Sequence, residues 1–172
     1  TANYSSEDTS LEVKSTMKFG AAIRLGDVNG IRFYTTVDTA KIAELKADGA
    51  TVEMGTLIAP KDLLGNDELT FNLDAGKYVD VAYKANEYYT EGNFTGIVGS
   101  IVNIKESNTA FSAENGNIAR EFVGRGYVKV TKDGKTTITY ADYSNSNIEN
   151  NSRSVAYVAY KFANDESEPL KQ

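Results

Sequence analysis

The side chains best suited to bind a ligand in this chain are its tyrosines, eleven in number beside seven phenylalanines and no tryptophan. An aromatic face stacks on the C–H groups of a sugar ring, and a tyrosine adds a hydroxyl group for hydrogen bonding. Two clusters stand in polar surroundings: Tyr88, Tyr89 and Asn93 in the first, and Tyr140, Asp142 and Tyr143 in the second. We predict that these clusters bind a ligand. The alternative is that their rings clamp loops or pack on sheet edges.

Catalytic chemistry is restricted because the chain contains neither histidine nor cysteine. The usual general base, the thiol nucleophile and the usual ligands of transition metals are therefore missing. Paired carboxylates, such as Asp74 with Asp80 or Glu114 with Glu121, are the acid and base that a glycosidase would need. A chain with 24 acidic residues contains such pairs by chance. We expect the protein not to be an enzyme.

Two polar stretches carry oxygen atoms of the kind that calcium prefers. They are Gly65–Glu68 and Asn145–Asn151. Neither has the ligand spacing of an EF-hand loop. We expect no metal site and no cofactor, with calcium as the alternative.

The stretch Gly20–Asp38 has the pattern of a β-hairpin, with two alternating runs on either side of a Gly-Asp-Val-Asn-Gly break. We expect Leu25 to lie opposite Ile31, on the apolar face. This register places Arg24 opposite Arg32 on the other face. Like charges in that position are destabilising unless an acceptor lies between them.

A shared acidic partner is therefore expected for these two arginines, with Asp80 or Asp142 as candidates. We expect Arg120, Arg125 and Arg153 to serve as further structural ties. The alternative is that the arginine pair binds an anionic ligand.

Length and charge limit the classes of partner. The 172 residues are enough for one domain with a sizeable core. A formal net charge of −6 argues against nucleic acid and anionic membrane surfaces. No apolar run reaches the roughly 18 to 20 residues that membrane insertion requires. Because the chain begins at Thr1, we expect a mature fragment of a longer protein.

Most of the chain alternates with the period of β-strands. Further strands are expected at Leu11–Phe19, Thr51–Ala59, Glu68–Leu73, Lys77–Tyr83, Phe94–Ile104 and Ile118–Thr131. Short helices are expected at Thr39–Ala47, at Pro60–Gly65 and at Ser152–Ala163. A three-residue turn, Lys132–Gly134, would place Val128 opposite Ile138.

The expected fold is a mainly β domain, a β-sandwich or a curved antiparallel sheet, with two or three short helices including a C-terminal one. Residues 11–164 form a single β-rich module in this interpretation. Residues 1–10 are a linker or frayed terminus, and residues 165–172 are a linker tail. Gly124 and Gly126 on either side of Arg125 indicate a close approach of the backbone or a bulge.

Four motifs together resemble an accessory module that recurs in secreted multi-modular proteins of anaerobic, often gut-dwelling, Gram-positive bacteria. They are GAAIRLGDVNGIRFYTTVD, GTLIAPKDLL, REFVGRGYVKV and RSVAYVAYKF, and the resemblance covers most of the chain, from about Phe19 to Phe162. The resemblance implies a secreted or cell-surface location and a non-catalytic role beside anchors, dockerins, leucine-rich repeats or carbohydrate-active enzymes. The lack of tryptophan departs from typical sugar-binding modules.

Together these observations favour a non-catalytic extracellular accessory module that binds a cell-wall or dietary polysaccharide, or another cell-surface glycan. The alternative is a structural or adhesive spacer domain that mediates protein interaction on the cell surface.

Overall fold

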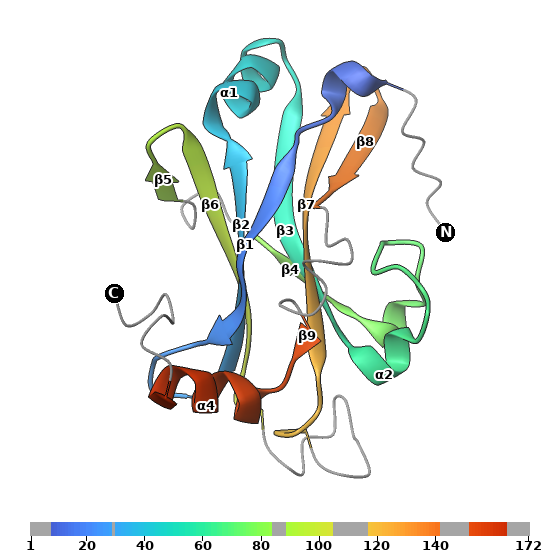
Figure 1. The fold of residues 1–172 in the computed structure, drawn as a ribbon. Helices are drawn as coiled ribbons and strands as arrows, with labels where there is room; N and C mark the ends of the chain where they lie inside the picture. The colour runs from blue at the N-terminus through green and yellow to red at the C-terminus, as the bar shows by residue number, and fades with distance from the viewer. Residues whose placement is uncertain (1–7, 29, 84–88, 105–116, 142–151, 165–172) are drawn as a thin grey trace.

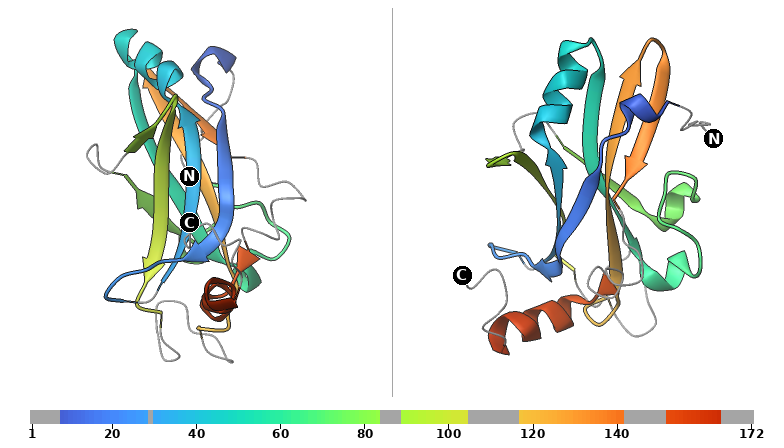
Figure 2. Two further views of the ribbon diagram at one scale, coloured as in Figure 1. Left: turned by 60° about the vertical axis from the view of Figure 1, so that its left-hand side comes forward. Right: turned by 45° about the horizontal axis from the view of Figure 1, so that its top comes forward.

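The computed structural model describes residues 8–28, 30–83, 89–104, 117–141 and 152–164. The chain forms two antiparallel sheets that pack face to face, with helices at the two ends of the sandwich (Figures 1 and 2). Nine strands and three α-helices lie within these residues. The expected mainly β fold with a C-terminal helix is confirmed.

The first sheet has the strand order β1-β2-β6-β5. Its strands are β1 (Ser15–Ile23), β2 (Gly30–Asp38), β5 (Tyr89–Glu91) and β6 (Phe94–Val102). Strand β6 lies between β2 and β5, and Thr95–Ile97 and Gly99 within it are buried.

The second sheet has the strand order β4-β3-β7-β8, and β9 also pairs with β7. Its strands are β3 (Thr51–Pro60), β4 (Val79–Ala82), β7 (Phe122–Lys132), β8 (Lys135–Tyr140) and β9 (Ser152–Arg153). Strand β3 is buried from Met54 to Pro60, which means that both of its faces are covered.

Helix α1 (Thr39–Ala47) begins where predicted, because the Asp38 carboxylate accepts hydrogen bonds from the Ala40 and Lys41 amides. Helix α2 (Lys61–Leu64) is a single turn after Pro60. Two 3-10 turns, η1 (Thr9–Leu11) and η2 (Ala75–Lys77), complete the short elements.

Helix α4 (Val155–Asn164) closes one end of the sandwich (Figure 1). It begins later than the predicted Ser152, because Ser152 and Arg153 pair with β7 instead. Ser154 is the residue that caps it, since its hydroxyl accepts a hydrogen bond from the Tyr157 amide. Val155 and Val158 of the helix are buried against the sandwich.

The two sheets approach most closely where glycines of β6 and β7 face side chains of the opposite sheet. A Cβ atom on Gly124 would lie 2.3 Å from Phe33, and one on Gly126 would lie 2.4 Å from Thr35. A Cβ atom on Gly99 would lie 2.4 Å from Thr56. The close approach predicted at Gly124 and Gly126 is confirmed, and only glycine fits at these positions.

The register of the first hairpin differs from the prediction. Ile31 pairs with Ile23, and Arg32 pairs with Ala22, so the expected pair of Arg24 and Arg32 does not form. The observed pairing is offset by two residues from the predicted one, and β1 itself contains an irregularity between Lys18 and Ala22.

The loop between β1 and β2 therefore contains residues that were expected in strands. Leu25, expected on the apolar face, is 55% exposed. The Arg24 guanidinium donates a hydrogen bond to the Val28 carbonyl within the loop. Asp80, a predicted partner of the arginine pair, accepts a hydrogen bond from the Tyr127 hydroxyl at 2.8 Å instead. Asp142, the other candidate, lies outside the described residues.

The register of the second hairpin is also shifted, by one residue. Val128 pairs with Thr139, and Ile138 pairs with Lys129. Asp133 and Gly134 both have left-handed backbone conformations, with φ of 51° and 75°. Such a pair forms the two-residue type I′ turn that matches the twist of the strands, so the three-residue turn is wrong.

Three arginines tie distant segments together, as predicted. Arg120 donates two hydrogen bonds to the Asp62 carboxylate, at 2.7 and 2.6 Å, and so holds α2 against the segment before β7. Arg153 donates to the Ala21 carbonyl in β1. Arg125 donates to the carbonyl of Ala141 at 2.8 Å.

We predict that Gly126→Ala lowers the free energy of unfolding by about 1 to 3 kcal/mol, because the added methyl group forces the two sheets apart. Gly76→Ala is the matched control, since a Cβ atom there has no neighbour within 4 Å. Urea denaturation measures both. Equal stability of the two variants would contradict the close packing described above.

We predict that Asp62→Asn destabilises the protein by about 1 kcal/mol at neutral pH and by much less under acidic conditions. The hydrogen bonds from Arg120 lower the pKa of Asp62. This contribution is present above the carboxyl's ordinary pKa of about 4 and is lost as the pH falls through the lowered folded value. The free energy of unfolding of Asp62→Asn should be compared with that of the wild type from pH 7 to pH 2. Glu121→Gln is the control, because it removes an exposed ion pair with Lys61. A stability difference that persists at pH 2 would contradict this assignment.

Candidate functional site

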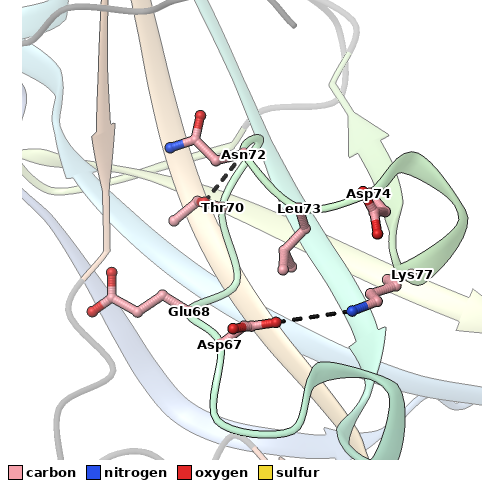
Figure 3. Close-up of a pocket in the computed structure, with 7 residues that line it drawn as sticks. All are labelled: Asp67, Glu68, Thr70, Asn72, Leu73, Asp74 and Lys77. Atoms are coloured by element: carbon pink, nitrogen blue, oxygen red, sulfur yellow. Dashed lines mark hydrogen bonds and ion pairs between the residues drawn. The ribbon is translucent and has the colours of Figure 1, made fainter.

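A polar hollow of about 330 Å³ lies on the segment that connects α2 to β4 (Figure 3). Its lining residues are Asp67, Glu68, Thr70, Asn72, Leu73, Asp74 and Lys77. They include carboxylate, amide, hydroxyl and ammonium groups, and apart from Leu73 every lining side chain is polar or charged.

The prediction of a strand at Glu68–Leu73 is wrong, and this is why the hollow exists. The Thr70 hydroxyl accepts a hydrogen bond from the backbone N–H of Asn72, and the Thr70 carbonyl accepts one from the backbone N–H of Leu73. These local bonds satisfy the backbone without a neighbouring strand. The segment turns back on itself and presents its polar side chains around an open space (Figure 3).

Apolar side chains anchor this segment to the outer face of the second sheet. Leu69 is fully buried in a cluster that includes Leu57 and Tyr127. The ring of Phe71 meets the ring of Tyr127 edge-on, with centroids 4.9 Å apart. The same ring lies 6.2 Å from that of Tyr78. The segment is therefore packed as a partial third layer on the sandwich.

Tyr140 and Arg125 hold the same segment through polar contacts. The Tyr140 hydroxyl accepts a hydrogen bond from the Phe71 amide at 3.1 Å. The Arg125 guanidinium lies 5.0 Å from the centre of the Tyr140 ring and also donates to the carbonyls of Leu69 and Ala141. Tyr140 thus clamps a loop, which is the alternative role considered for the predicted tyrosines.

The side chains around the hollow carry more negative than positive charge. Three carboxylates line it, those of Asp67, Glu68 and Asp74, against the single ammonium group of Lys77. Lys77 lies 3.9 Å from Asp67 in an exposed ion pair (Figure 3). Such an exposed pair contributes little to stability, so these groups are available for hydrogen bonds to a ligand.

The described residues contain no group of three or more acidic side chains placed to hold a metal ion. Asp67 and Glu68, the acidic residues of the Gly65–Glu68 stretch considered for calcium, are among the described residues and belong to no such group. The Asn145–Asn151 stretch lies outside the described residues.

Of the carboxylate pairs considered for glycosidase chemistry, Asp74, Asp80 and Glu121 lie within the described residues. Asp74 lines the hollow, whereas Asp80 accepts a hydrogen bond from the Tyr127 hydroxyl on β7. Burial raises the pKa of Asp80, and the Tyr127 hydrogen bond partly offsets this effect. Glu121 forms an ion pair with Lys61, and Glu114 lies outside the described residues.

The predicted ligand-binding residues are spread over both sheets. Tyr89 belongs to β5 in the first sheet, and Asn93 is exposed in the turn that follows, where its carbonyl accepts a hydrogen bond from the Thr39 amide. Tyr140 belongs to β8 in the second sheet. Tyr88, Asp142 and Tyr143 lie outside the described residues.

The hollow was not predicted from the sequence, although turn-forming residues on both sides of its segment indicate a loop. Gly65–Asp67 and Asp74–Gly76 are rich in turn-forming residues, which leaves only six residues between them for a strand. The anchoring contacts from Tyr140 and Arg125 come from distant parts of the chain and leave no local pattern.

A second hollow, of about 540 Å³, lies between η1, α1 and the β7–β8 turn. Its two lysines are both engaged, Lys41 with Glu44 and Lys132 with Asp48. The second hollow therefore contains two ion pairs between its own lining residues, whereas the first hollow contains one, between Lys77 and Asp67.

Comparison of the chain with family models, curated proteins and solved structures gave no match. Among the described residues, no helix combines the length and the apolar composition needed to cross a membrane.

We predict that Tyr140→Phe leaves the Phe71 amide without its acceptor and loosens the loop around the hollow. Hydrogen exchange of that amide should accelerate, and the free energy of unfolding should fall by about 1 kcal/mol. Tyr160→Phe is the control, because Tyr160 is 66% exposed. Unchanged exchange at Phe71 in Tyr140→Phe would show that the hydroxyl does not hold the loop.

Proposed function

We propose that this chain is a non-catalytic carbohydrate-binding module and that the hollow between α2 and β4 holds part of the glycan. The observation that carries the proposal is a polar hollow on an anchored loop. Asn72, Thr70 and the carboxylates around them offer the acceptors and donors that sugar hydroxyl groups require.

The anchoring of the loop supports binding because an ordered site loses less entropy when a ligand arrives. Leu69 and Phe71 are packed on the sheet, and Tyr140 and Arg125 hold their backbone. The polar side chains of the hollow therefore project from a backbone that is fixed before binding.

Tyr140, the described member of the second predicted tyrosine cluster, contacts the loop that forms the hollow. Arg125 contacts the carbonyl of Leu69 beside the hollow and also that of Ala141, the residue before Asp142. We propose that Asp142 and Tyr143 also take part in binding, although both lie outside the described residues. Tyr88, Tyr89 and Asn93 stay the other predicted binding cluster.

We further propose that the parent protein is secreted or held at the cell surface and that the module tethers it to cell-wall or dietary polysaccharide. The resemblance of four sequence motifs supports this location. The absence of histidine and cysteine supports a non-catalytic role.

Affinity electrophoresis on a panel of polysaccharides, with a glycan array, tests the proposal. We expect retention of the wild-type chain on at least one glycan and loss of retention in the double variant Asn72→Ala/Asp74→Ala. Asp27→Ala, which removes an exposed carboxylate in the β1–β2 loop, should bind like the wild type.

The double variant Tyr88→Ala/Tyr89→Ala separates the two candidate surfaces. Loss of binding in this variant alone would move the site to that cluster and contradict the hollow. No retention on any glycan would contradict carbohydrate binding and favour the alternative, a structural or adhesive spacer that mediates protein interaction.

A further inference from the structure

The side chain of Tyr127 crosses one strand of the second sheet to reach a carboxylate on the next. Tyr127 belongs to β7 and Asp80 to β4, and β3 lies between these two strands. The Tyr127 hydroxyl donates a hydrogen bond of 2.8 Å to the Asp80 carboxylate. The contact therefore ties β4, at one end of the strand order, to β7.

Gly55 on β3 leaves the space that this contact needs. It pairs with Tyr127 on one side and with Ala82 of β4 on the other. A Cβ atom at Gly55 would lie 2.5 Å from the Tyr127 hydroxyl oxygen and 2.7 Å from two ring carbons. The ring thus lies directly over the backbone of Gly55, and a side chain there would displace the hydroxyl from Asp80.

The Tyr127 ring supports one wall of the hollow between α2 and β4. This wall contains Thr70 and Asn72, and Phe71 lies between them in the sequence (Figure 3). The Phe71 ring packs edge-on against Tyr127, with the ring centroids 4.9 Å apart. The position of the Tyr127 ring therefore sets the position of the backbone that carries Thr70 and Asn72.

The Asp80 side of the contact supports the other wall. Asp74 and Lys77 line the hollow and flank η2, and β4 begins two residues after Lys77. The hydrogen bond from Tyr127 holds β4 at Asp80, its second residue. The two walls of the hollow are therefore connected to each other through this one contact.

The negative charge of Asp80 has a cost for the fold. The covered part of the carboxylate loses hydration, which raises the pKa of Asp80. The Tyr127 hydrogen bond and the Lys129 ammonium group oppose this rise, whereas the Glu53 carboxylate adds to it. Asp80 also remains exposed enough to exchange protons with solvent. An asparagine could accept the same hydrogen bond without this cost, so the carboxylate is a candidate for a functional role.

We propose that Asp80 is a positioning residue for the hollow, and that the hollow loosens when the Asp80 carboxylate takes up a proton. An ionised carboxylate accepts a stronger hydrogen bond than a neutral group does. The contact with Tyr127 therefore holds both walls most firmly at neutral pH. Because a loosened site loses more entropy on binding, glycan affinity falls under acidic conditions, a consequence that rests on the proposed function.

Amide hydrogen exchange tests the positioning role without any ligand. The backbone N–H groups of Leu73 and Lys77 report on the two walls, because they donate hydrogen bonds to the carbonyls of Thr70 and Asp74. The backbone N–H of Val158, which is hydrogen-bonded within the C-terminal segment, is the internal control.

Two variants break the contact without removing much volume. We expect Asp80→Asn and Tyr127→Phe each to accelerate exchange at Leu73 and Lys77 several-fold at pH 7. The exchange of Val158 should stay unchanged. Asp133→Asn, which neutralises an exposed carboxylate in the β7–β8 turn, should behave like the wild type.

The pH dependence identifies Asp80 as the group that titrates. The difference in exchange between the wild type and Asp80→Asn should disappear as the pH falls from 7 to 3, because Asp80 of the wild type is then protonated. The hollow has carboxylates of its own, so comparison of the two proteins at each pH isolates the contribution of Asp80.

The free energy of unfolding should change in the opposite direction to the order of the hollow. At pH 7, Asp80→Asn should be at least as stable as the wild type, because it removes a charge that burial disfavours. A raised pKa means that the folded state binds the proton more tightly, so the wild type gains stability relative to the variant as the pH falls. A contact with only a structural role would lower stability and slow exchange together.

Affinity electrophoresis at pH 7 gives the functional readout, with the polysaccharide of the panel that retains the wild type most strongly. Retention by Asp80→Asn should correspond to an affinity reduced roughly two- to ten-fold, whereas Asp133→Asn should bind like the wild type. Unchanged retention by Asp80→Asn would overturn the link between the contact and binding.

The exchange measurement fails or succeeds independently of the proposed function. Equal exchange at Leu73 and Lys77 in the wild type and Asp80→Asn would overturn the positioning role, even if a glycan binds. No retention of the wild type on any glycan, together with exchange that depends on Asp80, would contradict the proposed function and support the positioning role.

Discussion

The close approach of the two sheets at Gly99, Gly124 and Gly126 is the constraint on which the rest of the structure depends. Phe33, Thr35 and Thr56 occupy the space that side chains at these glycines would fill. The sulfur of Met17 accepts hydrogen bonds from the Thr35 hydroxyl and the Gly126 amide within the same buried layer. Because packed interiors tolerate little added volume, this layer sets the spacing and alignment of the sheets.

That alignment determines which side chains of β7 lie on the outer face of the second sheet. With the glycines of β7 turned inward, the alternate residues Val123, Arg125 and Tyr127 face outward, where the loop between α2 and β4 covers them. The loop is ordered by packing and by hydrogen bonds from distant residues, so its own side chains remain available for ligand binding.

Much of the fold could be predicted from the sequence, because alternation and capping are local signals. Asp38 and the spacing of apolar residues after it define α1, and the apolar run at Phe94–Ile104 indicates the strand that the structure has at Phe94–Val102. The pairing registers of the strands were harder to predict. The irregularity in β1 and the two-residue turn at Asp133 depend on backbone geometry that several sequences allow. The hollow depends on contacts from Tyr140, more than sixty residues away, and no local pattern reports them.

Amide chemical shifts of the labelled chain, recorded during titration with soluble cell-wall and plant oligosaccharides, test the central claim most directly. The account predicts shifts at Thr70, Asn72 and Lys77 around the hollow, saturating with ligand, while the amides of β6 stay unchanged. Shifts confined to other parts of the chain, or no shifts with any oligosaccharide at millimolar concentration, would contradict it.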